Sequence, residues 1–377
     1  MPHPLAVHLV GSWSRPAWLS SPHIADALGP PEHFWRPQPE YLKEAQDDAT
    51  RLAITDQLEL GVDLVVDGEQ RRQIFDRYFY ARLAGVDADH PALHTWGGPA
   101  GARASQSWRK VTKDLESAEG PPRVPSPRVV GPVSWPGPLA VDDFQFLNDA
   151  VAGRRPSKMT MSGPITALNR LVDEWYHDRE RLGRDIARAL NQEAHALADA
   201  GCRYIQFDEP EFRTAHLTDP EESRRLINQV VDGLKEKGVA TYAHMCYGYA
   251  NAVLNKSVNP EFYASLELMA STNIDGVSIE YAQPGHTSDV LHALGNKVVI
   301  LGCINCAPEA PVETADEVAA RLREALTVVP ASRLHASTDC GLWFLPRDRA
   351  RAKLAALVEG TRQVRRELGL HPDRIQP

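Results

Sequence analysis

Hydrophobic and polar positions follow a regular order along the chain, in which short apolar runs alternate with longer amphipathic segments. Eight runs have the length and apolar character of buried strands, at residues 7–12, 64–69, 158–164, 204–210, 241–247, 276–282, 297–304 and 333–341. Apolar residues recur at helical spacing between most of these runs, as in residues 184–201 and 315–329. The alternation predicts an α/β fold of the (β/α)8 TIM-barrel type, although a doubly wound parallel sheet would show a similar pattern.

Polar residues gather at the carboxyl ends of these runs. The residues at these ends include Ser12, Glu69, Asp208, His244, Cys246, Glu280 and Cys340. The carboxyl ends of all strands in such a barrel lie on one face, and that face carries the active site. We therefore expect these side chains to meet at one mouth of the barrel.

One segment, at about residues 84–157, departs from the alternation because it is rich in proline, glycine and tryptophan. It predicts a long excursion over the barrel mouth, with a β-hairpin as one component. A lid and a plain surface insertion or oligomer contact both fit this composition. The chain shows no internal repeat and no second domain, so residues 1–377 are predicted to form a single catalytic barrel that carries this insertion.

Charge and hydropathy narrow the class of protein. The net charge of −9 argues against a nucleic-acid partner, which calls for a basic face. No apolar run approaches the roughly 20 residues that span a bilayer, so no membrane partner is expected. The N-terminus lacks the pattern of a signal peptide, and we expect a cytoplasmic protein, with a homo-oligomer left open.

The five cysteines do not indicate a disulfide framework, because they are widely spread and their number is odd. Reduced thiols are expected, with Cys202, Cys303 and Cys306 as core or strand-end residues.

The remaining two cysteines belong to a candidate metal site. His244 and Cys246 lie two residues apart on one predicted strand, so their side chains point the same way. Glu280 ends the next predicted strand and Cys340 ends the last. Imidazole, thiolate and carboxylate suit a four-coordinate zinc ion, so Zn2+ is the predicted cofactor. A metal ion with such electron-rich ligands is better suited to bind and deprotonate a substrate thiol than to convert bound water to hydroxide. A pair of core residues is the alternative for His244 and Cys246.

Seven stretches in combination resemble the C-terminal catalytic barrel of the cobalamin-independent methionine synthases, and nearly the whole chain takes part. These stretches are VGS (10–12), DGE (67–69), MSGPIT (161–166), IQFDEPEFR (205–213), HMCY (244–247), SIE (278–280) and DCG (339–341). The resemblance implies a barrel of the UROD/MetE-like type and zinc on the four residues named above. It also implies a thiol pocket with Ser12, Glu69 and Asp208, in which the two acids are catalytic-site residues that hold the amino group of homocysteine.

Two features of the full-length enzymes of that family are missing. A tryptophan that stacks on folate is absent from TALNRLVDEW, where Arg170 lies near its place. The proton-shuttling histidine after the seventh strand is absent from CINCAPEAP. Methyl transfer from folate requires protonation of a poor leaving nitrogen, so these departures weaken a folate reaction and leave the general acid open.

The resemblance therefore indicates a zinc-dependent thiol S-alkyltransferase with two candidate substrates. The preferred interpretation is an epoxyalkane:coenzyme M transferase (2-hydroxypropyl-CoM lyase), in which a coenzyme M thiolate opens an epoxide. The alternative is a single-barrel methionine synthase that methylates homocysteine. The partners are thus a small thiol and a carbon electrophile.

Residues near the predicted mouth bear on that choice. Arg15 and Arg71 are candidate substrate-binding residues, because a guanidinium donates to a sulfonate in a planar fork. Trp343 is expected to wall the pocket. Retention of Glu69 and Asp208 favours an amino-acid substrate instead. A metal-free decarboxylase relative acting on a porphyrin and a non-catalytic zinc scaffold are further alternatives.

Overall fold

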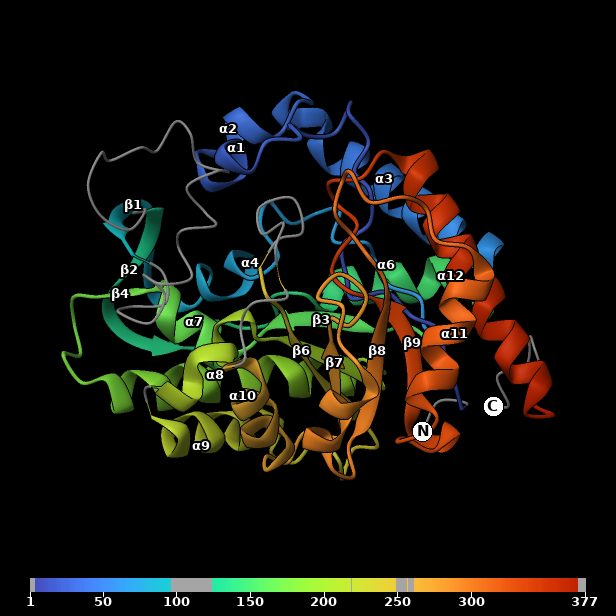
Figure 1. The fold of residues 1–377 in the computed structure, drawn as a ribbon. Coiled ribbons are helices and arrows are strands. Elements are labelled where there is room, and N and C mark those ends of the chain that lie inside the picture. Colours follow the sequence, from blue (N-terminus) through green and yellow to red (C-terminus); the bar gives the residue numbers. More distant parts are fainter. Residues whose placement is uncertain (1–3, 96–123, 218, 249–255, 257–260, 372–377) are drawn as a thin grey trace.

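The computed structural model of the chain describes residues 4–95, 124–217, 219–248, 256 and 261–371 (Figure 1). The strands are β1 (Ala84–His94), β2 (Val124–Ser134), β3 (Met159–Ser162), β4 (Val172–Asp173), β5 (Tyr204–Asp208), β6 (Ala240–Met245), β7 (Gly276–Ile279), β8 (Val298–Ile304) and β9 (Leu334–Thr338). The α-helices are α1 (Ile24–Leu28), α2 (Pro31–Phe34), α3 (Pro39–Leu60), α4 (Arg77–Tyr80), α6 (Val141–Val151), α7 (Pro164–Arg170), α8 (Arg179–Asp199), α9 (Pro220–Val231), α10 (Glu261–Ala270), α11 (Ala315–Ala325) and α12 (Arg347–Glu367). Short 3-10 helices are η3 (Pro210–Leu217), η4 (Ser288–Leu294) and η5 (Ala331–Arg333).

Parallel strands form a closed barrel at the centre of the molecule. Six of them make one sheet in the order β3-β5-β6-β7-β8-β9. Single parallel bridges join the two edges of this sheet through two further segments: Val7–Ala336, His8–Leu64 and Val65–Ser157. All eight predicted strand positions are therefore confirmed as members of a (β/α)8 barrel, and the doubly wound alternative is excluded by the closure.

The local sequence explains the regular elements. Every residue of β8 is buried, as expected for a parallel strand that lies between the barrel interior and outer helices. Helix α8 begins after Asp178, whose side chain accepts a hydrogen bond from the backbone N–H of Arg181. The helix ends before Gly201, whose φ of 103° is readily adopted only by glycine. Within the described residues, no helix combines the length and the apolar character needed to cross a membrane.

The segment predicted as an insertion contains two different structures. β1 and β2 pair antiparallel, and β2 also pairs with β4, which makes a separate three-stranded sheet at one side of the barrel (Figure 1). Helix α6 packs against α3 and α8, as a barrel helix between the second and third strands would. Residues 96–123 lie outside the described part, so covering of the mouth by this segment stays a prediction.

Gly360 provides a test of the packing between α12 and α11. A Cβ at Gly360 would lie 2.5 Å from the carbonyl oxygen of Ala315 and 2.6 Å from Cβ of Val318. Alanine favours a helix over glycine by about 1 kcal/mol. We nevertheless expect Gly360→Ala to lower the free energy of unfolding by about 1–3 kcal/mol, because the backbone must move to make room. Urea denaturation measures this change.

Gly183→Ala in α8 is the matched control, since its nearest neighbours would be side-chain methyl groups, of Leu226 at 3.1 Å and of Leu168 at 3.2 Å. A side-chain end can rotate away, so this variant should stay within about 1 kcal/mol of the wild type. Unchanged or raised stability of Gly360→Ala would contradict the packing described here.

Candidate metal and thiol site

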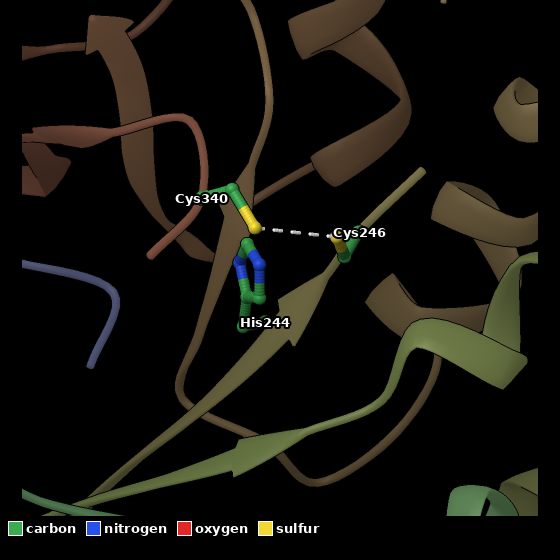
Figure 2. A group of neighbouring side chains, drawn as sticks. All are labelled: His244, Cys246 and Cys340. Atoms are coloured by element: carbon green, nitrogen blue, oxygen red, sulfur yellow. Dashed lines mark hydrogen bonds between the residues drawn. The ribbon is translucent and has the colours of Figure 1, made fainter. Parts of the chain in front are cut away.

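Three buried side chains with metal-binding atoms meet at the carboxyl ends of β6 and β9, and Figure 2 shows them turned toward one another. His244 lies in β6, Cys246 directly follows that strand, and Cys340 follows β9. Their ligand atoms all lie within 4.8 Å of one another. The two sulfur atoms are 3.6 Å apart, far beyond the roughly 2.05 Å of a disulfide, and all five cysteines are free thiols.

The geometry of this group fits a zinc ion. Zinc–sulfur bonds of about 2.3 Å in a tetrahedral arrangement place two sulfurs about 3.8 Å apart. Nε2 of His244 is buried and has no hydrogen-bond partner among the described residues. Nδ1 of the same ring lies 3.1 Å from the Ser278 hydroxyl oxygen. An imidazole that is held through one nitrogen and presents the other is typical of a metal-ligating histidine.

The protonation states also suit a cation. Burial lowers the pKa of His244 to about 3, so its imidazole is neutral, as a metal ligand must be. The hydrogen bond shared with Cys340, together with burial, raises the pKa of Cys246 well above its usual value. Negative charge is thus disfavoured at this sulfur by its neighbours, and a divalent cation between the sulfurs would reverse that preference.

Glu280, the predicted fourth ligand, borders the three-residue group without belonging to it. Its Oε1 lies 3.2 Å from Sγ of Cys246 and accepts a hydrogen bond from the backbone N–H of Tyr247 (3.1 Å). Its Oε2 lies 2.7 Å from Nζ of Lys256. The structure therefore places Glu280 in contact with one cysteine, and its role as a ligand stays a prediction.

A cavity of about 670 Å³, including its open mouth, lies against the metal-binding group. Its lining includes the predicted residues Ser12, Arg15, Glu69, Asp208, His244, Cys246, Cys340 and Trp343. Phe75 and Phe344 add to the aromatic wall beside Trp343. The sequence does not single out these two phenylalanines, because the loops that carry them have no periodic pattern.

Glu69 is fixed in an unusual backbone conformation. Its φ is 58°, a left-handed value that is uncommon outside glycine and is often found at functional sites. Asp67 stabilises the turn by accepting a hydrogen bond from the Glu69 N–H (2.9 Å), and Thr160 donates its hydroxyl to Oε1 of Glu69 (2.9 Å). A Cβ at Gly11 would lie 2.4 Å from that same oxygen, which explains the glycine of the VGS stretch.

Asp208 lies at the end of β5 and shares the cavity with Glu69. Its Oδ1 accepts a hydrogen bond from Nε2 of Gln206 (2.8 Å). Burial, and then the charge of Glu69, raises the pKa of Asp208 well above its usual value; burial also raises the pKa of Glu69. Two buried carboxylates on one cavity favour the binding of an additional cation, and a substrate ammonium group would supply it.

Arg15 and Trp343 form part of the cavity wall, as predicted. The guanidinium of Arg15 donates to the carbonyl oxygen of Glu69 (3.0 Å) and to that of Arg72. It also lies over the Trp343 ring, 4.4 Å from the centroid. Arg15 thus ties the turn that carries Glu69 to the aromatic wall.

Arg71 does not lie at the cavity, contrary to the expectation. Its Nη2 donates to Asp47 of α3 (2.6 Å), and its Nε is 3.6 Å from Asp143 of α6. The guanidinium also lies over the Phe146 ring. These partners turn the side chain toward the outer helices, and Arg71 is not among the residues that line the cavity.

Lys158 is a buried cation beneath the two acids. Its Nζ donates to Oε1 of Gln206 (2.7 Å) and to the carbonyl oxygen of Val10 (3.2 Å). Because Gln206 in turn donates to Asp208, one amide connects the ammonium with the carboxylate. Burial lowers the pKa of Lys158 to about 7.

This lowered pKa predicts a pH-dependent stability. Above about pH 7 the unfolded chain still binds the lysine proton whereas the folded chain releases it, so stability increases with pH. We expect the stability of the wild type, relative to Lys158→Met, to rise by about 1.4 kcal/mol per pH unit between about pH 7 and pH 9. Urea denaturation of both proteins across this range measures the difference. A difference independent of pH would show that Lys158 keeps its proton in the fold.

Together, these features define a class: a (β/α)8 barrel enzyme with a thiol and imidazole cluster and an acid pair in one cavity at its mouth. A family profile described as "Cobalamin-independent synthase, Catalytic domain" matches residues 102–363. The chain belongs to this family, which confirms the resemblance found in the sequence motifs.

Similar proteins cover nearly the whole chain. The methionine synthase of Saccharolobus solfataricus is 30% identical over 375 residues, which cover 97% of this chain and 96% of the relative. That of Sulfurisphaera tokodaii is 29% identical over 365 residues, covering 97% and 94%. The structure of a B12-independent methionine synthase from Shewanella sp. W3-18-1, in complex with selenomethionine, has a TM-score of 0.81 at 32% identity and covers 98% of this chain and 99% of that one.

Proposed function

We propose that this protein transfers a methyl group to the sulfur of homocysteine. The observation that carries the proposal is the shared cavity, in which the metal-binding group lies on the same surface as the acid pair. A substrate that has both a thiol and an ammonium group matches these two parts. The relatives named methionine synthases support the same substrate.

Zinc is the proposed cofactor, with His244, Cys246 and Cys340 as ligands and Glu280 as a replaceable fourth. When bound, it would lower the pKa of a substrate thiol and keep the sulfur nucleophilic at neutral pH. A cavity beside the cluster suits an open catalytic site more than the closed site of a structural scaffold.

Residues of the chain orient the substrate for transfer. Glu69 and Asp208 accept charge-assisted hydrogen bonds from the substrate ammonium. Trp343 and its aromatic neighbours exclude water from one side of the sulfur. The sulfur then forms a bond to the methyl carbon while the bond from that carbon to the donor breaks. The bonding electrons leave with the donor, and the thiol proton passes to solvent.

The epoxide interpretation, preferred from the sequence, has less support than its alternative. Arg71, one of its two sulfonate-binding candidates, is held by α3 and α6. Two arginines also line the cavity, but Arg15 donates to the carbonyl oxygen of Glu69, and Arg170 pairs with Asp76 and Glu211. The two acids of the cavity would disfavour the sulfonate of coenzyme M, because like charges in proximity are costly. The named relatives point to methionine synthesis as well, so homocysteine replaces coenzyme M as the proposed thiol. A methyl donor is the proposed second substrate, and the cytoplasm is the proposed location.

The metal assignment can be tested by removing either thiol. We expect Cys246→Ala and Cys340→Ala to abolish methyl transfer and to lower zinc affinity by more than about 100-fold. Loss of a residue that only supports a metal ligand costs up to about 100-fold, and loss of the ligand itself should cost more. Metal analysis after dialysis gives the zinc content. Cys202→Ala is the matched control, because Cys202 is fully buried and its thiol donates to the backbone carbonyl oxygen of Tyr204, away from the metal-binding group. A zinc-free variant at either ligand position with full activity would refute the assignment.

The role of the acid pair can be tested with two thiols. Asp208→Asn removes a charge-assisted contact of about 1.5–3 kcal/mol, so homocysteine affinity should fall about 10- to 100-fold. Binding of 4-mercaptobutyrate, which lacks the amino group, should change far less. Calorimetric titration of zinc-loaded protein measures both affinities. Equal losses of affinity for the two thiols would mean that Asp208 does not bind the ammonium group.

A further inference from the structure

Lys256 is a buried cation that the sequence motifs do not single out. Its side chain has no exposed surface, and neither has that of its partner Glu280. Nζ of Lys256 lies 2.7 Å from Oε2 of Glu280 and donates a hydrogen bond to the carbonyl oxygen of Gly248 (3.0 Å). A buried lysine is costly unless paired, so this position requires an acidic partner.

The charges around Lys256 belong to the proposed metal site. Nζ of Lys256 contacts one oxygen of Glu280, and the other oxygen of that carboxylate lies 3.2 Å from Sγ of Cys246. Two thiolates and a carboxylate carry one more negative charge than a divalent cation can offset. The ammonium supplies the missing positive charge without being a ligand itself.

Glu280 lies between two possible partners. One of its carboxylate oxygens faces Sγ of Cys246 and the other faces Lys256. A carboxylate that leaves a buried metal needs another partner at once, since an uncompensated buried charge is strongly destabilising. Lys256 is placed to be that partner.

Building on the proposed function, we propose that Lys256 is a positioning residue that receives Glu280 when the substrate thiol takes its place on the metal. Glu280 then competes less with the incoming sulfur, and the fourth position stays accessible to thiols. Lys256 is the one cationic side chain that pairs with Glu280 among the residues that the structure describes. Without it, the carboxylate stays on the metal and competes with the thiol.

Two variants and one control test this role. Lys256→Met removes the cation, and Lys256→Met/Glu280→Gln removes both charges of the pair. Lys353→Met is the matched control, because Lys353 forms a buried pair with Glu313 (2.8 Å) between α12 and the segment before α11. Zinc content, homocysteine affinity by calorimetry, and the number of sulfur neighbours by zinc-edge X-ray absorption are measured for each protein.

The proposal predicts a specific order of affinities. Lys256→Met keeps its zinc but binds homocysteine at least about tenfold more weakly, and the third sulfur neighbour appears only at higher thiol concentration. The double variant regains affinity to within about threefold of the wild type, because no carboxylate competes with the thiol. Lys353→Met binds homocysteine like the wild type. If Lys256→Met does not fold, Lys256→Gln, which keeps an N–H donor without the charge, replaces it and should also bind more weakly.

The outcomes separate this inference from the proposed function. Zinc-loaded wild type that gains no third sulfur with homocysteine would overturn the proposed function. A wild type that gains the sulfur, together with a Lys256→Met variant of equal affinity, would overturn only the role of Lys256. A double variant as weak as the single variant would also overturn it, because Glu280 would then not be the competitor.

Discussion

Negative charge buried at one mouth of the barrel is the constraint on which the rest of the site depends. Glu69, Asp208 and Glu280 lie there with two thiols, and all are almost completely removed from water. Carboxylates and thiolates in such a place need positive partners. Arg72 beside Glu69 and Lys256 against Glu280 supply part of that charge, and Lys158 beneath Asp208 adds to it below about pH 7. A zinc ion and the ammonium of an amino-acid thiol would supply the remainder.

The closed barrel is what brings these groups together. Glu69, Asp208, His244 and Cys340 are separated by many residues in the chain, but each lies at the carboxyl end of a barrel strand. The parallel register keeps all these ends at one face, and the pairing of Asp208 with His244 in neighbouring strands joins the acid pair to the metal group. Neighbouring strands of one sheet therefore carry the residues proposed to bind the ammonium group and the thiol of the substrate.

Much of this arrangement could be predicted from the sequence, for physical reasons. Buried parallel strands have continuous apolar runs, so the eight runs appear directly, and the spacing of His244 and Cys246 places both on one side of a strand. Contacts with distant surface elements leave no such pattern. Arg71 faces Asp47 and Asp143 of outer helices, and Lys256 pairs with Glu280, 24 residues further along the chain. Neither contact follows from residue type or spacing, so only the three-dimensional fold shows them.

The central claim is that the cavity binds homocysteine as a thiolate, with its ammonium on the acid pair. Calorimetric titration of the zinc-loaded protein, in buffers of different ionisation enthalpy, measures proton release for homocysteine and separately for coenzyme M. The account predicts proton release with homocysteine and none with coenzyme M. Proton release with coenzyme M alone would contradict it and would indicate a sulfonate-binding pocket suited to epoxide opening.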